Sequence, residues 1–172
     1  MVNAPLHAPG ARAVAAPAPG ARTLGIDLGE RRIGLALSDP SGTLATPLHT
    51  LAPAGGLAAR VAAVAQVIER LAAEEDGLAA IVVGWPLALD GGAHEQTARV
   101  EAFVAALRRR TALPVRLQDE RLTSREAESR LALREKDWRR RRRRLDAAAA
   151  AVILQEHLDA GPAAAGEPGD DG

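Results

Sequence analysis

The 172-residue sequence contains no cysteine and no tyrosine, and it has only one phenylalanine and two tryptophans. Without cysteine, the chain forms no disulfide bond and offers no thiolate to a metal ion. Because aromatic residues are so few, the core must be aliphatic, and the length suits a single domain. No apolar run reaches the length of a membrane span, and the first 22 residues lack the apolar stretch of a secretory signal. We therefore expect a cytoplasmic protein.

Charge is balanced over the whole chain, with 22 residues of each sign, but it is unevenly distributed. The segment from Arg108 to Arg144 contains 15 basic residues against 6 acidic ones, a net charge of +9. A basic segment of this kind suits a polyanionic partner such as nucleic acid.

The two ends of the chain have a different composition from the middle. Residues 1–21 are dominated by Ala, Pro and Gly, and residues 161–172 are similar. Such segments have little apolar surface to bury, so we interpret them as a disordered leader and tail. The folded domain is predicted to span residues 22–160.

Residues 23–38 are typical of two paired strands, because apolar residues alternate on both sides of a short turn that begins at Gly29. Asp27 interrupts the first of these strands. A carboxylate in mid-strand is unfavourable there and is costly to bury unpaired. Asp27 is therefore either a partly exposed residue bonded to a neighbouring turn, or an acid held on a rigid strand to bind a metal ion or a phosphate-bearing partner.

The rest of the chain alternates between strand and helix patterns. The predicted elements are a strand at 43–51, a helix at 57–71, a buried strand at 78–84, a helix at 95–109, a strand at 114–118, a helix opened by the capping box of Thr123 and Glu126, and a final helix at 145–158. Pro47 favours an edge position for the strand at 43–51. This order predicts an α/β fold: a mixed five-stranded sheet, with three antiparallel strands followed by parallel crossovers and helices on both faces.

Three acids have notable positions in these predicted elements. Asp27 lies within the first strand, Glu120 just past the last strand, and Asp146 at the start of the last helix. Taken singly, Asp146 is explained as a helix cap and Glu120 as a surface partner of Arg121. In the predicted sheet, however, the first and last strands flank the strand at 78–84, so all three acids could meet at one end. Clustered carboxylates repel one another unless cations lie between them, and oxygen ligands favour Mg²⁺ or Mn²⁺. Two such ions are the usual apparatus for phosphodiester hydrolysis.

Six consecutive arginines, Arg139 to Arg144, end two residues before Asp146. We interpret this run as a loop that is either a solvated charged segment or the rim of the site in contact with phosphates. The second interpretation is favoured.

Four blocks of sequence stand out in order along the chain: GIDLGERRIGLALSDPSGTLATPL, IVVGWPLALDGG, LPVRLQDERLTSREAE and LDAAAAAVILQEHLD. In order and spacing they resemble the YqgF family, also called RuvX or Holliday-junction-resolvase-like proteins. The resemblance extends from about Thr23 to Asp159. It implies an RNase H-like fold and a nuclease that matures the small-subunit (16S) ribosomal RNA precursor, with precursor rRNA and pre-ribosomal particles as partners.

The resemblance also implies roles for individual residues. Asp27, Glu120 and Asp146 would be the catalytic acids and the ligands of Mg²⁺ or Mn²⁺. Arg121 would support the site or hold a phosphate, and Arg142 or Arg143 would match the basic residue before the last acid. The predicted nucleic-acid-binding residues are thus Arg121, Arg139, Arg140, Arg142 and Arg143.

Three other functions are considered. A two-lobed nucleotide-binding protein of the actin and sugar-kinase type shares the GIDLG pattern, but about 140 folded residues do not supply a second lobe. A branched-DNA resolvase would use the same acids, and phosphate contacts do not separate RNA from DNA. A non-catalytic RNA-binding assembly factor would keep the fold without using the acids.

Overall fold

The computed structural model describes residues 20–86, 94–119 and 138–161. Its elements, in chain order, are β1 (Arg22–Leu28), β2 (Ile33–Ser38), β3 (Ala45–Leu51), α1 (Leu57–Ala72), β4 (Leu78–Trp85), α2 (His94–Arg108), β5 (Val115–Asp119) and α4 (Trp138–Ala160). The helix predicted from Thr123 lies outside the described residues, as do nearly all of the predicted leader and tail.

The five strands form one mixed sheet in the order β3-β2-β1-β4-β5. β1, β2 and β3 pair antiparallel, whereas β4 runs parallel to both β1 and β5. The predicted topology is therefore confirmed, including the central place of β4 between β1 and β5. β3 lies at an edge, and its register with β2 shifts next to Pro47, where the strand cannot donate a ladder hydrogen bond.

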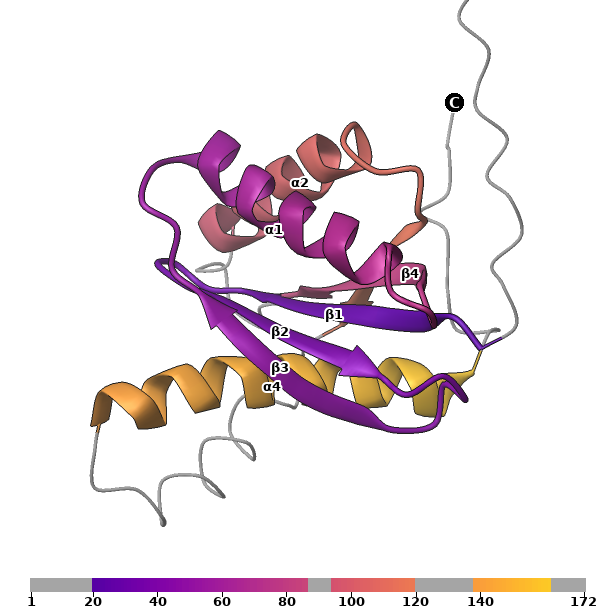
Figure 1. The fold of residues 1–172 in the computed structure, drawn as a ribbon. Helices are drawn as coiled ribbons and strands as arrows, with labels where there is room; N and C mark the ends of the chain where they lie inside the picture. The colour runs from indigo at the N-terminus through magenta and orange to yellow at the C-terminus, as the bar shows by residue number, and fades with distance from the viewer. Residues whose placement is uncertain (1–19, 87–93, 120–137, 162–172) are drawn as a thin grey trace, which may run out of the picture.

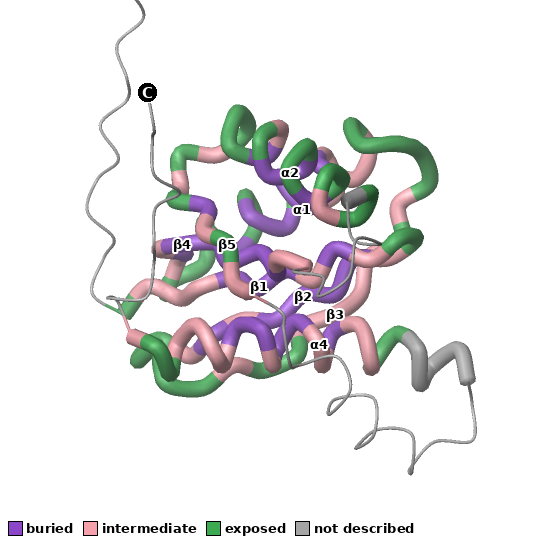
Figure 2. Tube along the Cα trace, turned by 180° about the vertical axis from the view of Figure 1, so that it is seen from behind, coloured by how far each residue is buried: buried purple, intermediate pink, exposed green. Residues whose placement is uncertain are grey.

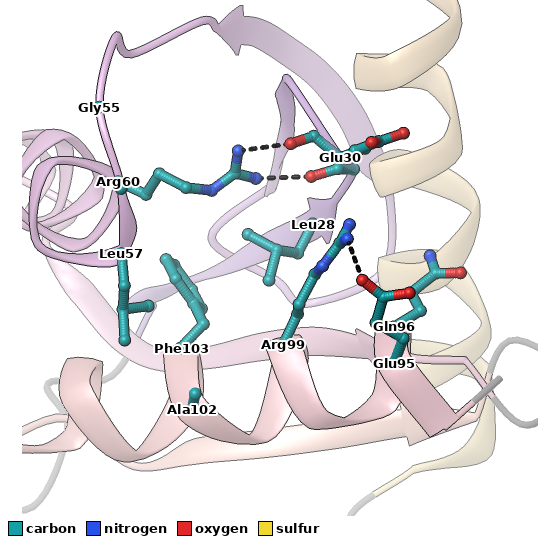
Figure 3. A pocket seen from close by; sticks show the side chains of 12 residues that line it. Leu28, Glu30, Gly55, Leu57, Arg60, Glu95, Gln96, Arg99, Ala102 and Phe103 are labelled. Atoms are coloured by element: carbon teal, nitrogen blue, oxygen red, sulfur yellow. Dashed lines mark hydrogen bonds and ion pairs between the residues drawn. The ribbon is translucent and has the colours of Figure 1, made fainter.

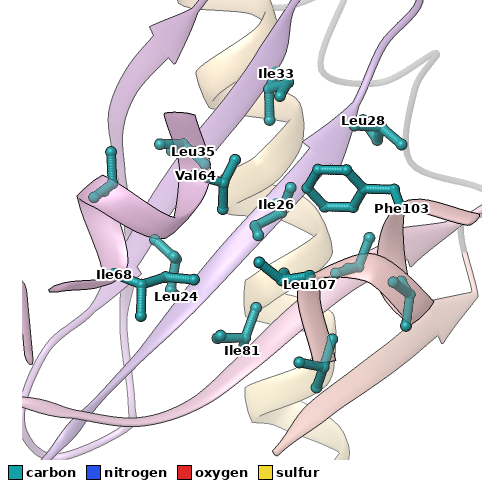
Figure 4. Close-up of a cluster of buried hydrophobic side chains, with 14 of the residues drawn as sticks. Leu24, Ile26, Leu28, Ile33, Leu35, Val64, Ile68, Ile81, Phe103 and Leu107 are labelled. Atoms are coloured by element: carbon teal, nitrogen blue, oxygen red, sulfur yellow. The ribbon is translucent and has the colours of Figure 1, made fainter. Parts of the chain in front are cut away.

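Helices cover both faces of the sheet (Figure 1). α1 and α2 pack on one face, where the alternating leucines and isoleucines of β1 and β2 are buried. Figure 4 shows this aliphatic core, in which Phe103 of α2 is the one aromatic ring among the labelled residues. Phe103 is fully buried. The core is thus aliphatic, as the composition predicts.

The other face is covered by α4, which packs through small residues. Ala150, Ala151 and Leu154 of α4 are buried against Ala36 and Val82 of the sheet. Buried positions recur along the helix where it faces the strands (Figure 2). Gly25 of β1 points to the same face, and a Cβ there would lie 2.8 Å from the Cβ of Leu154. Short side chains on both surfaces therefore let the helix lie close to the sheet.

The start of α4 corrects one prediction. The helix begins at Trp138 rather than at residue 145, so the arginine run lies within its first two turns and is not a loop. Arginine is a good helix former, and the packed alanines further along hold the helix to the sheet, which outweighs the repulsion between neighbouring charges.

The topology and the two helical layers give the RNase H-like arrangement that the resemblance implies. None of the helices within the described ranges is both long enough and apolar enough to cross a membrane.

Candidate active site

Asp27 lies near the carboxyl end of β1, on the face of the sheet that α4 covers. Its Cα partner in β2 is Gly34, so the two residues point to the same face. The side chain of Asp27 is half-buried, unlike its fully buried neighbour Ile26, which points to the opposite face. The strand therefore presents a carboxylate at the boundary between core and solvent.

Gly34 brings Asp146 to the same place. A Cβ on Gly34 would overlap the carbonyl group of Asp146, so the backbone of α4 touches the strand at this point. Since Gly34 is also the partner of Asp27, the two predicted acids lie on elements that meet across one glycine. This contact places the last helix against β2 beside the carboxyl end of β1, where Asp27 lies.

Asp146 is not at the start of a helix, as the sequence suggested. It lies about two turns inside α4, so it does not cap the orphan N–H groups of a helix terminus. Its Oδ2 atom is buried and lies 3.4 Å from Nε of Arg32. The capping explanation for this acid is therefore wrong, and an inward-facing carboxylate takes its place.

Arg32 completes the described part of the site. It ends the turn between β1 and β2, where its carbonyl accepts a hydrogen bond from the Gly29 N–H at 2.9 Å. Its side chain is about one quarter exposed, as is that of Asp146. A guanidinium is thus held beside a partly buried carboxylate at the edge of the site.

The remaining predicted site residues are placed only in part. Glu120 and Arg121 directly follow Asp119, the last residue of β5, and lie outside the described residues. Arg139, Arg140 and Arg142 lie on the first turns of α4, and the structure describes only their backbone. Arg143 is exposed, and its carbonyl accepts a 2.6 Å hydrogen bond from the Thr50 hydroxyl of β3.

The donor set fits a hard divalent cation. Asp27 and Asp146 supply carboxylate oxygens, the ligands that Mg²⁺ and Mn²⁺ prefer. Within residues 20–86, 94–119 and 138–161, no three His, Asp or Glu side chains form a group that could hold a metal ion. The third predicted ligand, Glu120, lies outside those ranges.

Sequence reasoning missed Arg32 and Gly34. Arg32 and Asp146 are far apart in the chain, so no local sequence pattern predicts their contact. Gly34 did carry a signal, because a glycine inside a strand often marks the close approach of another backbone.

The fold and the two acids Asp27 and Asp146 define a class of protein, the α/β proteins with an RNase H-like sheet, one carboxylate near the end of the first strand and another on the last helix. The family model described as "RuvX: Holliday junction resolvase" matches residues 21–160. The chain belongs to this family. It is accordingly a nuclease, a hydrolase that acts on phosphodiester bonds of nucleic acid.

Individual relatives agree with this assignment. Proteins named "Putative pre-16S rRNA nuclease" are 44% identical over 146 residues in Leifsonia xyli and 43% identical over 151 residues in Nocardioides sp.. These alignments cover 85% and 86% of this chain and 90% and 93% of the relatives. Among solved structures, Thermus thermophilus RuvC in complex with a Holliday junction substrate matches with a TM-score of 0.47 and 20% identity, covering 81% of this chain and 94% of that one.

Proposed function

We propose that this chain is a metal-dependent endonuclease that processes the 5′ end of the 16S ribosomal RNA precursor. It would act in the cytoplasm, on the precursor within pre-ribosomal particles. One observation of the structure supports this most strongly: Gly34 is the strand partner of Asp27 and also touches the backbone of Asp146. The relatives' names supply the proposed substrate.

Asp27, Glu120 and Asp146 would together hold Mg²⁺ or Mn²⁺. When bound, the ions offset the negative charge that develops on the phosphate during hydrolysis. The chain's own contribution is to fix Asp27 on a central strand and Asp146 on a packed helix, so that neither carboxylate has to be ordered during the reaction.

The arginines have a separate role in this proposal. Arg121, Arg139, Arg140, Arg142 and Arg143 would hold the phosphates that flank the cleaved bond. Phosphate contacts of this kind position a nucleic acid without selecting its sequence.

A four-way DNA junction is the second candidate substrate, because the description of the matching family model names a Holliday junction resolvase. Both substrates need the same acids and the same divalent ions. They are therefore separated by experiment and not by the geometry of the site.

The test compares cleavage of a labelled 16S precursor RNA with cleavage of a four-way DNA junction, with Mg²⁺ or Mn²⁺ and with chelator. We expect the wild type to cut the RNA only when the metal is present. Asp27→Asn should reduce the cleavage rate by about 100-fold or more, because it removes a negatively charged ligand without changing the size of the side chain.

Glu69→Gln is the matched control, since Glu69 is an exposed acid on α1. It should cut like the wild type. Metal-dependent cutting of the junction alone would replace RNA by DNA as the substrate. A wild type that binds RNA but cuts neither nucleic acid would instead show a non-catalytic assembly factor.

A further inference from the structure

A second feature lies on the opposite side of the β1–β2 turn from the two acids. It is a cavity of about 860 Å³ between that turn, the start of α1 and the first turns of α2. Leu28 and Gly29, the two residues that follow Asp27, form part of its wall. Figure 3 shows that Arg60 of α1 and Arg99 of α2 both extend into this space.

Arg60 is fixed by the turn itself. Its guanidinium donates hydrogen bonds to the carbonyls of Gly29 at 2.5 Å and Glu30 at 3.0 Å (Figure 3). Both acceptors are neutral, so these bonds orient the guanidinium and leave its positive charge in place. The carboxylate of Glu30 is turned away from Arg60 in the same view.

Arg99 adds a second positive charge to the cavity. Burial, together with the nearby Arg99 guanidinium, lowers the pKa of Arg60 from its ordinary value. Two like charges that share a cavity disfavour each other unless an anion lies between them. Arg99 donates a 2.8 Å hydrogen bond to Glu95, but both side chains of this pair are largely exposed, at 49% and 82%. An exposed pair one helical turn apart is weak and readily exchanged.

Apart from the carboxylates of Glu30 and Glu95, the wall contains groups that suit a nucleotide. The loop that enters α1 contains Gly55 and Gly56, which leave this rim of the cavity without side chains, and the first turn of α1 has no acidic residue. Leu57 is 42% exposed and also lines the cavity, so it offers an apolar surface beside the arginines. Cationic and apolar groups together match a phosphate with its attached sugar or base.

We propose that this cavity binds a backbone phosphate of the nucleic-acid substrate, close to the phosphate that is cut. The inference rests on the proposed function, because it assumes that the substrate lies at Asp27. A strand that crosses the β1–β2 turn passes from the acids on one side to Arg60 and Arg99 on the other. The turn would thus separate the cleaved phosphate from the bound one.

The test measures binding of a fluorescein-labelled single-stranded RNA to the full chain by anisotropy, in chelator and over a range of salt concentrations. Arg99→Gln should raise the Kd by about 3- to 10-fold and reduce the slope of log K against log salt by about 1. Glu95→Gln should lower the Kd, because it releases Arg99 from its competing carboxylate.

The matched control is Arg70→Gln, which removes one exposed arginine from the far end of α1, about 15 Å along the helix from Arg60. Its Kd should stay within about twofold of the wild type. Arg60→Gln should weaken binding like Arg99→Gln. The thermal stability of Arg60→Gln must be measured as well, because Arg60 also donates hydrogen bonds to the β1–β2 turn.

Equal RNA affinity for the wild type, Arg99→Gln and Glu95→Gln would overturn the inference. The cleavage activity of the wild type would be unaffected by that result, so the proposed nuclease function would stand. If instead the wild type does not cut while Arg99→Gln still weakens binding, the nuclease function fails and the phosphate site remains.

Discussion

Among single residues, Arg32 has the most direct influence on the charge of the candidate site. Its Nε lies 3.4 Å from the buried oxygen of Asp146, so a fixed cation already occupies one side of that carboxylate. A divalent ion bound by Asp146 would lie near this guanidinium, and like charges at short range oppose each other. In the proposed metal site, Arg32 would therefore lower the metal affinity while its contact orients Asp146.

Replacing Arg32 by Gln should accordingly tighten metal binding by about 2- to 5-fold, because one repulsive charge is removed. Calorimetry on the full chain measures the Kd for Mn²⁺ directly and does not require the protein to cut a substrate. Arg31→Gln is the matched control, since it removes the same charge from the exposed neighbouring position. Weaker metal binding in Arg32→Gln would show that the arginine chiefly positions Asp146.

Two acids of the candidate site, Asp27 and Asp146, stand out in the sequence, whereas their neighbours do not. Asp27 was recognisable because a carboxylate in an apolar strand breaks a local pattern. Arg32 breaks none, since an arginine in a turn is an ordinary surface residue, and its role depends on which helix later packs beside it. Placing Asp146 in mid-helix likewise required knowing how far α4 extends.

Among the elements, α4 determines whether the site exists at all. It carries Asp146, and Gln155 ties it to the edge of the sheet: the Gln155 side chain accepts from the Ala45 N–H and donates to the Thr43 carbonyl, both at 2.9 Å. Gly34 is the point of closest approach, where the strand has no Cβ and the helix backbone fills the space. The position of the helix is thus fixed by packing and by hydrogen bonds at two separate levels.

Gly34→Ala should destabilise the protein by about 3 kcal/mol or more, at or above the upper end of the usual cost of overpacking, because its Cβ meets a carbonyl group that cannot rotate away. Urea unfolding followed by circular dichroism gives the free energy of unfolding. Gly56→Ala is the control: its Cβ would meet no atom within 4 Å, and its cost should stay below about 1 kcal/mol. Equal urea midpoints for Gly34→Ala and Gly56→Ala would contradict the close approach of α4 to the strand at Gly34.

β1, β2 and the first two helices were predictable because burial of one face imposes a clear period on the sequence, and β4 was predictable as a short apolar run followed by a glycine. The first two turns of α4 have no such face in their sequence, since six successive arginines show no apolar period. Because the six arginines repel one another, a loop was predicted for this segment. The helix forms there because its later turns are anchored against the sheet.

The whole molecule is neutral, yet its charge is separated. The basic segment ends inside α4, so the arginine run lies at the amino-terminal end of a helix, where the helix dipole is also positive. Cations at that end are unfavourable for the helix. The arrangement costs some stability in the free protein and gives a strong local attraction for a polyanion.

Replacing both Arg139 and Arg140 by Gln should therefore have opposite effects on stability and on binding. The thermal midpoint should stay the same or rise, because two positive charges leave the positive end of the helix. RNA affinity should fall, and its salt slope should decrease by about 1 to 2. Arg70→Gln, which removes an exposed positive charge from the far end of α1, should leave the slope unchanged. A lower midpoint with unchanged affinity would show that the run is structural.

The site is divided between the two ends of the chain, with Asp27 on the first strand and Asp146 on the last helix. Proteins emerge from the ribosome amino terminus first, so a growing chain contains β1 long before it contains α4. A fragment that ends before Asp146 therefore has Asp27 without the acid on the last helix. In the proposed nuclease, which needs both acids, such a fragment would be unable to cut nucleic acid.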